Sequence, residues 1–232
     1  MARGWKAVVS GFLVWPSICR PRSSLINTFR QSFDSTGATM LENIIHIEKP
    51  PQVQEKTLQV IDNAVGDDLA ERIWQIVNRP KWHWGHMSRK SAPQKFWAMD
   101  LNGEEAMKEL FESVRPHFDI AAHTKLALRK VNASGHTHGL GGAIHQDYNT
   151  DDYYSMLYYA NPVWHPKFGG ETQFYSDDLN YIIHSVMPKP SRVVFFDGRI
   201  PHFGRSPSRE FWGVRVAIAF KLKVITRDAA AP

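Results

Sequence analysis

The sequence predicts a mainly β fold, a sandwich or jelly roll, with two helices that buttress one side of it. From about residue 125 onward, apolar and polar residues alternate in short segments, separated by Gly, Pro, Asn or Asp at roughly 8–12-residue intervals. The preceding part instead has two segments in which apolar residues recur with the period of a helix. With 232 residues, 12% of them aromatic, the chain is long enough for one domain with a sizeable core.

One short strand and two amphipathic helices are expected before the β region. The segment 56–62 (KTLQVID) is typical of a strand. The carboxylates at 67–68 can cap a helix that ends before Pro80, and those at 104–105 begin a second helix that ends near Pro116. The inward-facing residues are Leu69, Ile73, Ile76 and Val77 in the first helix and Met107, Leu110, Phe111 and Val114 in the second.

Short strands follow the helices. The alternation begins at 126–130, and further strands are expected at 154–161, 171–175, 181–187, 192–197 and 214–224. The chain contains no internal repeat and no low-complexity block. We therefore expect one domain over residues 41–232, with helical support at 41–120 and a β core at 121–224.

The first forty residues differ from the rest. Residues 1–33 contain five basic and no acidic residues, and an apolar run covers 7–15. This composition is typical of a transit peptide, a signal peptide can begin in the same way, and Met40 is a further candidate for the true start. We treat 1–40 as a basic N-terminal extension. The domain is expected in the cytoplasm, or in an organelle if the extension is a transit peptide.

The charge balance disfavours a nucleic-acid partner. The net charge of +5 comes from the five basic residues of the extension, since removing them from the 28 leaves 23, equal to the 23 acidic residues. A groove that follows a phosphate backbone needs a basic excess in the folded domain. The single Cys19 excludes an internal disulfide and a cysteine-based metal site, and no apolar run approaches the roughly 18 residues of a membrane span.

Three residues stand out as candidate metal ligands. On an extended segment, His145 and Asp147 share one face. His202 follows an apolar strand 55 residues after Asp147. Two histidines and one carboxylate on one face of an octahedron leave three positions open, as in non-haem Fe(II) oxygenases. His136 and His138 form a weaker candidate pair because a flexible Gly-rich loop positions ligands poorly.

A candidate anion-binding residue lies on the last expected strand. Arg215 shares a strand face with Ala217 and Ala219, whose small side chains leave room for a ligand beside the guanidinium. A guanidinium binds a carboxylate through two parallel hydrogen bonds. Arg209 is a second candidate, although it lies in a polar, Pro-containing loop.

Five segments together carry a family resemblance: HQD at 145–147, LYYAN at 157–161, GGETQF at 169–174, VVFFDGRIPH at 193–202 and RVAIAFK at 215–221. In this order they resemble the Fe(II)- and 2-oxoglutarate-dependent dioxygenases, specifically the prolyl 4-hydroxylase-like branch. The resemblance covers about residues 120–224. It implies that the β core is a double-stranded β-helix, a form of jelly roll.

The resemblance also implies roles for single residues. The iron ligands would be His145, Asp147 and His202, and the cosubstrate-binding residues would be Arg215, Tyr159 and Asn132. Arg215 and Tyr159 would bind the distal carboxylate of 2-oxoglutarate. The family often has its basic residue about ten positions after the second histidine, so 205–213 contains a small insertion and Arg209 stays an alternative. The implied cofactors are Fe(II), 2-oxoglutarate and O2, with ascorbate as a supporting reductant.

The expected function is an oxygenase that hydroxylates an unactivated C–H bond and releases succinate and CO2. A small molecule or amino acid is the favoured substrate because no charged stripe indicates a polymeric partner, and a prolyl-type peptide residue is the alternative. Two other classes stay open: a cupin-like metalloenzyme without 2-oxoglutarate, and a non-catalytic β-sandwich binding module. Candidate lids are 81–97, 134–142 and 203–212, and the loop arginines Arg205 and Arg209 are expected to be solvated. Oligomeric state is not predicted.

Overall fold

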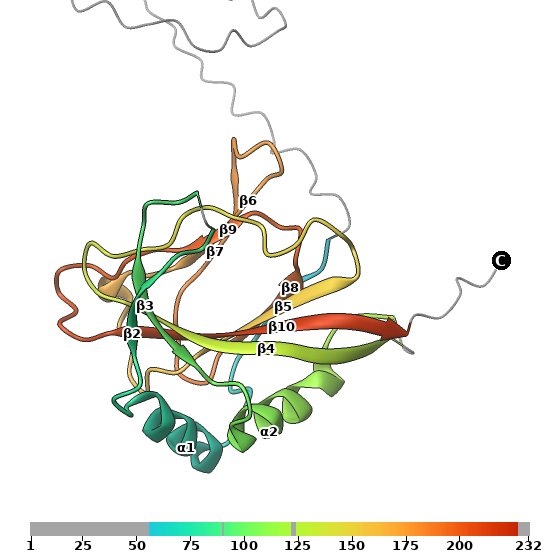
Figure 1. The fold of residues 1–232 in the computed structure, drawn as a ribbon, viewed down its shortest axis with the longest axis horizontal. Helices are drawn as coiled ribbons and strands as arrows, with labels where there is room; N and C mark the ends of the chain where they lie inside the picture. Colours follow the sequence, from blue (N-terminus) through green and yellow to red (C-terminus); the bar gives the residue numbers. More distant parts are fainter. Residues whose placement is uncertain (1–55, 90, 122–123, 227–232) are drawn as a thin grey trace, which may run out of the picture. The chain divides into compact units, whose positions relative to one another are not determined.

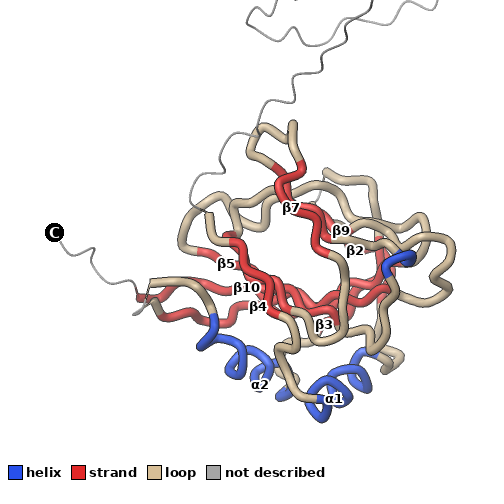
Figure 2. Tube along the Cα trace, turned by 180° about the vertical axis from the view of Figure 1, so that it is seen from behind, coloured by secondary structure: helices blue, strands red, loops and turns tan. Residues whose placement is uncertain are grey.

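Two antiparallel sheets form the body of the domain (Figure 1 and Figure 2). The structure, a computed structural model, describes residues 56–89, 91–121 and 124–226, and the extension expected at 1–40 lies outside them. Within these residues the larger sheet has the order β1-β8-β5-β10-β4-β3-β2 and the smaller sheet the order β7-β6-β9. This architecture confirms the expected mainly β, jelly-roll fold.

The strands have the following bounds. The larger sheet contains β1 (Leu58–Ile61), β8 (Val193–Asp197), β5 (Tyr153–Tyr159), β10 (Arg215–Thr226), β4 (Lys125–His136), β3 (Phe96–Asp100) and β2 (His83–His86). The smaller sheet contains β7 (Ile182–Val186), β6 (Thr172–Tyr175) and β9 (His202–Gly204). The five strands expected after residue 150 correspond to β5, β6, β7, β8 and β10.

Two helices cover the outer face of the larger sheet (Figure 1). They are α1 (Asp67–Val77) and α2 (Glu105–Val114), and a short 3-10 turn at Arg115–His117 follows α2. Ile73 and Leu110 are fully buried against the sheet. Burial of one such side chain contributes about 1.5–3 kcal/mol. The helices thus cover one face of the larger sheet. The smaller sheet and the candidate active site lie on its other face.

Strand β10 shows how the sequence pattern separates these two faces. Because successive side chains point to opposite sides of a sheet, its residues divide into two rows. Val216, Ile218, Phe220 and Leu222 are buried in the core beneath the helices. Arg215, Ala217, Ala219 and Lys221 line a cavity on the opposite face. The alternation of RVAIAFKL therefore places two cations on one wall of that cavity.

A second apolar core joins the two sheets. The rings of Phe174 on β6 and Phe196 on β8 meet edge to face with centroids 5.0 Å apart. Leu157 and Tyr159 on β5 belong to the same cluster. This packing fixes the smaller sheet over the larger one, so the cavity between them has rigid walls.

The segment 81–97, expected as a lid, instead supplies the edge strand β2 of the larger sheet and the first two residues of its neighbour β3. Trp84 and Trp97 are cross-strand partners, and their ring centroids lie 5.3 Å apart. The sequence HWGH has no apolar alternation, and Gly85, with φ +107°, interrupts the pairing. Because of these features, the sequence pattern did not indicate the hairpin. None of the helices in the described part of the chain is long and apolar enough to cross a membrane.

Candidate active site

Backbone pairing brings the three candidate metal ligands together. His145 and His202 exchange two backbone hydrogen bonds, with N···O distances of 3.0 and 2.9 Å, and their ring centroids lie 4.5 Å apart. The amide of Asp147 donates to the carbonyl of Gly198 at 3.0 Å, so the turn before His202 also holds the carboxylate in place. One potential ligand atom from each of the three side chains lies within 4.8 Å of the others.

The hydrogen bonds of both imidazoles orient their Nε2 atoms toward this shared point. Nδ1 of His145 lies 2.9 Å from the carbonyl oxygen of Ala143, and Nδ1 of His202 lies 2.9 Å from that of Ile200. A carbonyl oxygen only accepts, so each Nδ1 carries a hydrogen, and in the neutral form of each ring Nε2 presents its lone pair. Backbone carbonyls bind metal-ligating histidines in the same way.

The electrostatics favour the ligating forms of these groups. Burial lowers the pKa of His202 to about 4, despite the opposing effect of Asp147. Burial opposes ionisation of Asp147, but Lys221, His202 and His145 together hold its pKa well below the ordinary value. At neutral pH the site therefore contains a neutral His202 and a carboxylate. Neutral imidazole and carboxylate are the forms that bind a divalent cation.

Two side chains fix the carboxylate of Asp147. The hydroxyl of Ser155 donates to Oδ2 at 2.5 Å, and the ammonium of Lys221 forms an ion pair with the same oxygen. The other oxygen, Oδ1, lies 3.3 Å from Nε2 of His145. Oδ2 lies 3.7 Å from Nε2 of His202, but Ser155 and Lys221 already occupy it. Oδ1 is therefore the oxygen with free lone pairs, and the carboxylate can offer one ligand atom through it.

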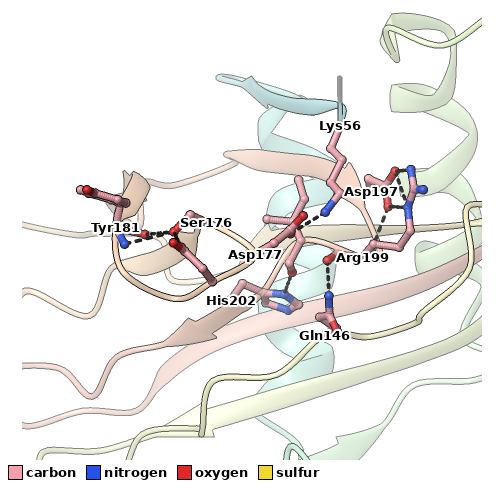
Figure 3. Close-up of polar contacts among 10 residues, drawn as sticks. Lys56, Gln146, Ser176, Asp177, Tyr181, Asp197, Arg199 and His202 are labelled. Carbon is pink, nitrogen blue, oxygen red and sulfur yellow. Dashed lines mark hydrogen bonds and ion pairs between the residues drawn. The ribbon is translucent and has the colours of Figure 1, made fainter. Parts of the chain in front are cut away.

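A salt-bridged turn supports the second histidine (Figure 3). The guanidinium of Arg199 pairs with the carboxylate of Asp197 at 2.6 Å, and its amide donates to the same carboxylate at 2.9 Å. The side-chain amide of Gln146 donates to the carbonyl of Arg199 at 2.7 Å. These contacts tie the turn before His202 to the segment that carries the other two candidate ligands.

Arg215 is a buried cation without a protein anion. Its exposed fraction is 1%, and among the described residues no carboxylate lies within ion-pair distance of it. Nε donates to the carbonyl of Gly170 at 2.5 Å and Nη2 donates to Oγ1 of Thr172 at 3.0 Å. The ring of Tyr159 lies 5.4 Å from the guanidinium carbon, and its hydroxyl donates to Oγ1 of Thr172 at 2.8 Å. Burial lowers the pKa of Arg215, and Tyr159 and Glu171 oppose this effect without forming an ion pair with it. A buried charge without a directly paired anion is costly, so this site has the chemistry of an anion receptor.

His136 adds a second polar group without a good partner. It is 3% exposed, and neither ring nitrogen makes a hydrogen bond of standard geometry within the described part of the chain. Burial, with a further contribution from Arg215, lowers its pKa to about 3. His138 is exposed, with Nδ1 3.3 Å from the carbonyl of Pro207, and does not join the candidate ligands.

One cavity of about 360 Å³ joins the three candidate ligands to Arg215. This size is typical of a small-molecule site. Its other polar lining residues are His86, Ser88, Arg89, Lys130, Asn132, Ser134, His136, Thr172 and Lys221. Asn132 thus faces the cavity, whereas Tyr159 lies behind Thr172. Arg209 is exposed and is not part of the lining.

Sequence analysis did not find several of these residues. Thr172 lies inside the segment GGETQF, but only the contact with Arg215 gives it a role. Ser155 and Lys221 have no spacing that connects them to Asp147. Their link depends on the pairing of β5 with β10, in which they are direct partners. The only sequence signal for Lys221 is its place in the same alternating row as Arg215.

Comparisons with known proteins agree with this architecture. A prolyl hydroxylase from Trichoplax adhaerens, in complex with a hypoxia inducible factor peptide fragment, is 20% identical and superimposes with a TM-score of 0.57 over 72% of this chain and 83% of its own. The viral collagen prolyl hydroxylase of Paramecium Bursaria Chlorella virus-1, in its 2-oxoglutarate complex, is 14% identical, with a TM-score of 0.52 over 75% of this chain and 100% of its own.

A third similar structure binds a different kind of molecule. HygX from Streptomyces hygroscopicus, with nickel, 2-oxoglutarate and hygromycin B bound, is 12% identical, with a TM-score of 0.50 over 73% of this chain and 84% of its own. No family model and no curated protein matches the sequence. At these identities the likeness establishes the fold. The chain is therefore built on the double-stranded β-helix fold that prolyl hydroxylases share with other 2-oxoglutarate oxygenases.

Proposed function

We propose that this protein is an Fe(II)- and 2-oxoglutarate-dependent oxygenase that hydroxylates a C–H bond. One observation carries the proposal: a single cavity joins the donor atoms of His145, Asp147 and His202 to the buried, carboxylate-free guanidinium of Arg215. We place the activity in the domain expected over residues 41–232.

The donor set fits Fe(II). Two imidazole nitrogens and one carboxylate oxygen lie within 4.8 Å of one another in the cavity. This is the facial triad that leaves three positions of an octahedral ion open. Ser155 and Lys221 restrict Asp147 to one free oxygen, which keeps the other positions available.

The anion receptor fits 2-oxoglutarate. We assign its distal carboxylate to Arg215, supported by the hydroxyl of Thr172, and its remaining oxygens to the open positions beside the three ligands. Tyr159 would act indirectly, by orienting Thr172 and packing against the guanidinium. Asn132 would contact the cosubstrate from the β4 wall.

The bound iron and 2-oxoglutarate would supply oxygen activation coupled to decarboxylation of the cosubstrate to succinate and CO2. The protein residues then have three tasks. The three ligands and Arg215 fix the cosubstrate at both ends, which lowers the entropic cost of reaching the reactive geometry. The apolar wall of Leu157, Ala217 and Ala219 limits the water around it. The remaining, open part of the cavity positions the substrate.

The substrate is the finer part of the proposal. Among the similar structures, one binds a peptide fragment and another binds hygromycin B. We favour a small molecule or amino acid because polar groups line the interior of a cavity of only about 360 Å³. A prolyl-type residue of a peptide is the alternative.

Anaerobic addition of 2-oxoglutarate to the Fe(II)-loaded protein tests the proposal. The chelate has a weak visible charge-transfer band, which we expect in the wild-type protein and in Arg209→Ala. Arg215→Ala should weaken it by lowering the affinity for 2-oxoglutarate. If Arg209→Ala alone weakens the band, the anchor assignment is wrong.

The same experiment separates the other two classes of function. Iron binding that requires His145, without a band at any 2-oxoglutarate concentration, would favour a cupin-like metalloenzyme. A folded protein that binds neither iron nor 2-oxoglutarate would favour a binding module.

A further inference from the structure

We infer that the substrate of this site carries an anionic group, of carboxylate or phosphate type, that Lys130 receives at the end of the cavity opposite Arg215, with Arg89 as a second cation of the lining. The inference rests on the proposed oxygenase function and adds a substrate class to it. It depends on the charges that line the cavity and on the places they occupy along its walls.

The charges of the cavity do not balance. Its lining contains Arg89, Lys130, Lys221 and Arg215, against the single carboxylate of Asp147. In the proposed complex the distal carboxylate of 2-oxoglutarate neutralises Arg215, and the bound cation shares the carboxylate of Asp147. The lysines and Arg89 then keep an excess of positive charge, which an anionic substrate would offset.

Lys130 and Lys221 occupy an unfavourable arrangement. They are direct cross-strand partners of β4 and β10, which run side by side (Figure 1), and both line the cavity. Like charges placed directly opposite each other destabilise a sheet. Asp147 compensates Lys221 through its ion pair. Lys130 and Arg89 are exposed to solvent, and within the described ranges no carboxylate lies within ion-pair distance of either. A local arrangement that opposes stability is typical of a functional site.

The pKa of the neighbouring His86 is affected by both lysines. Burial, followed by the charges of Lys130, His83 and Lys221, lowers the pKa of His86. His86 lines the same cavity beside Arg89. His86 is thus close enough to both lysines for their charges to act on it, and a neutral imidazole lining the same cavity can add a hydrogen bond to an anion held there.

This region is separate from the place assigned to 2-oxoglutarate. Arg215 and Lys221 stand six residues apart on β10, which corresponds to about 20 Å along a strand. Lys221 reaches Asp147, so the metal ligands lie toward its end of the row. A cosubstrate held between Arg215 and the metal ligands occupies the other end. Lys130, which lies opposite Lys221, is therefore available to bind the substrate.

The test uses the full chain with Mn(II) in place of Fe(II), 2-oxoglutarate at saturation, and inorganic phosphate as the probe. Paramagnetic Mn(II) accelerates 31P relaxation of phosphate bound nearby, so one titration reports both affinity and proximity. We expect saturable relaxation enhancement. Lys130→Gln should weaken phosphate binding about fivefold or more, and Arg89→Gln should weaken it further when combined with Lys130→Gln.

Lys125→Gln is the matched control. Lys125 is an exposed lysine of the same strand outside the cavity, so its replacement removes equal charge and should leave phosphate affinity unchanged. Equal phosphate affinities in wild type and Lys130→Gln would show that phosphate binds to the metal alone, which would overturn the inference. The absence of saturable relaxation enhancement would overturn it as well. The anaerobic Fe(II) band is measured on the same proteins. If the band forms and the phosphate test fails, only the substrate class is wrong; if no band forms, the oxygenase proposal itself fails.

Discussion

The ammonium of Lys221 forms an ion pair with the carboxylate of Asp147, with side-chain exposures of 17% and 5%. Lys221 belongs to the same cavity-facing row of β10 as Arg215, so one strand supplies a cation to each end of the site. Within the described residues no carboxylate lies within ion-pair distance of Arg215, whereas Lys221 has one. In the proposed function the two cations therefore have different roles: Arg215 would receive a ligand, and Lys221 would hold a candidate metal ligand in place.

Lys221→Met should destabilise the metal-free protein and increase its stabilisation by metal. Loss of the ammonium leaves Asp147 as a buried carboxylate without its cation, which costs about 3–5 kcal/mol. A bound divalent cation restores the balance, so Mn(II) should stabilise the variant more than the wild type. Urea unfolding with and without Mn(II) measures both effects.

Lys223→Met is the control for this prediction. Lys223 lies two residues further along β10, over the ring of Tyr153, and does not line the cavity. Equal stabilisation by Mn(II) in Lys221→Met and wild type would show that the ion pair does not contribute to the metal site.

Local patterns predicted the residues of the site that lie close together in sequence. His145 and Asp147 follow from the period of a strand, and the row of Arg215, Ala217 and Ala219 follows from the same rule. Lys130 could not be linked to Lys221 in this way, because their proximity depends on the register of β4 with β10. Such register arises from the packing of whole sheets and leaves no local signal.

The edge hairpin of β2 and β3 was missed for a different reason. Edge strands carry polar and glycine residues, so HWGH lacks the alternation that identifies an inner strand. The neighbouring helices were predicted correctly because their apolar faces pack against the sheet. The first one begins at Asp67 and ends before Pro80, but its N-cap is Gly66, and neither Asp67 nor Asp68 caps it as expected.

Gly170→Ala should weaken binding of 2-oxoglutarate by displacing Arg215. A Cβ at this position would lie 3.0 Å from Cδ and 3.3 Å from Nε of Arg215. The residue also has φ +76°, where a side chain costs about 1–2 kcal/mol. Gly139→Ala separates these effects, because Gly139 has φ +78° and open space around it. Both variants should lose stability, but only Gly170→Ala should need more 2-oxoglutarate to form the Fe(II) band. Equal titration curves for the two would contradict the contact argument.

Thr172→Val should reduce the affinity for 2-oxoglutarate more than Tyr159→Phe does. The hydroxyl of Thr172 lines the cavity and accepts hydrogen bonds from Arg215 and Tyr159 at 3.0 and 2.8 Å. A hydrogen bond to a charged group contributes about 1.5–3 kcal/mol, so we expect a loss of roughly tenfold or more. Tyr159 acts through Thr172 and should matter less. If Tyr159→Phe has the larger effect in the Fe(II)-band titration, the tyrosine contacts the cosubstrate directly, as the family resemblance implies.

The stability of the metal-free protein should rise steeply with pH between about 4.5 and 6. Burial lowers the pKa of His202 to about 4 and that of His136 to about 3, whereas an unfolded chain has histidines near 6.5. In this window the unfolded state binds two protons that the folded state does not. Because stability rises with pH wherever the unfolded state binds more protons, the two groups together contribute about 2.7 kcal/mol per pH unit.

His136→Leu tests how much His136 contributes to this pH dependence of stability. The leucine removes a buried imidazole whose ring nitrogens lack good hydrogen bonds, so the variant should be more stable than wild type below pH 6. Its stability should rise by only about 1.4 kcal/mol per pH unit in the same window, because the unfolded state then binds only one more proton than the folded state, at His202. His184→Asn, which removes an exposed imidazole from β7, is the control and should keep the wild-type slope. Urea unfolding at half-unit pH steps gives the slopes. An unchanged slope in His136→Leu would mean that His136 binds its proton equally in the folded and unfolded states, contrary to its burial beside Arg215.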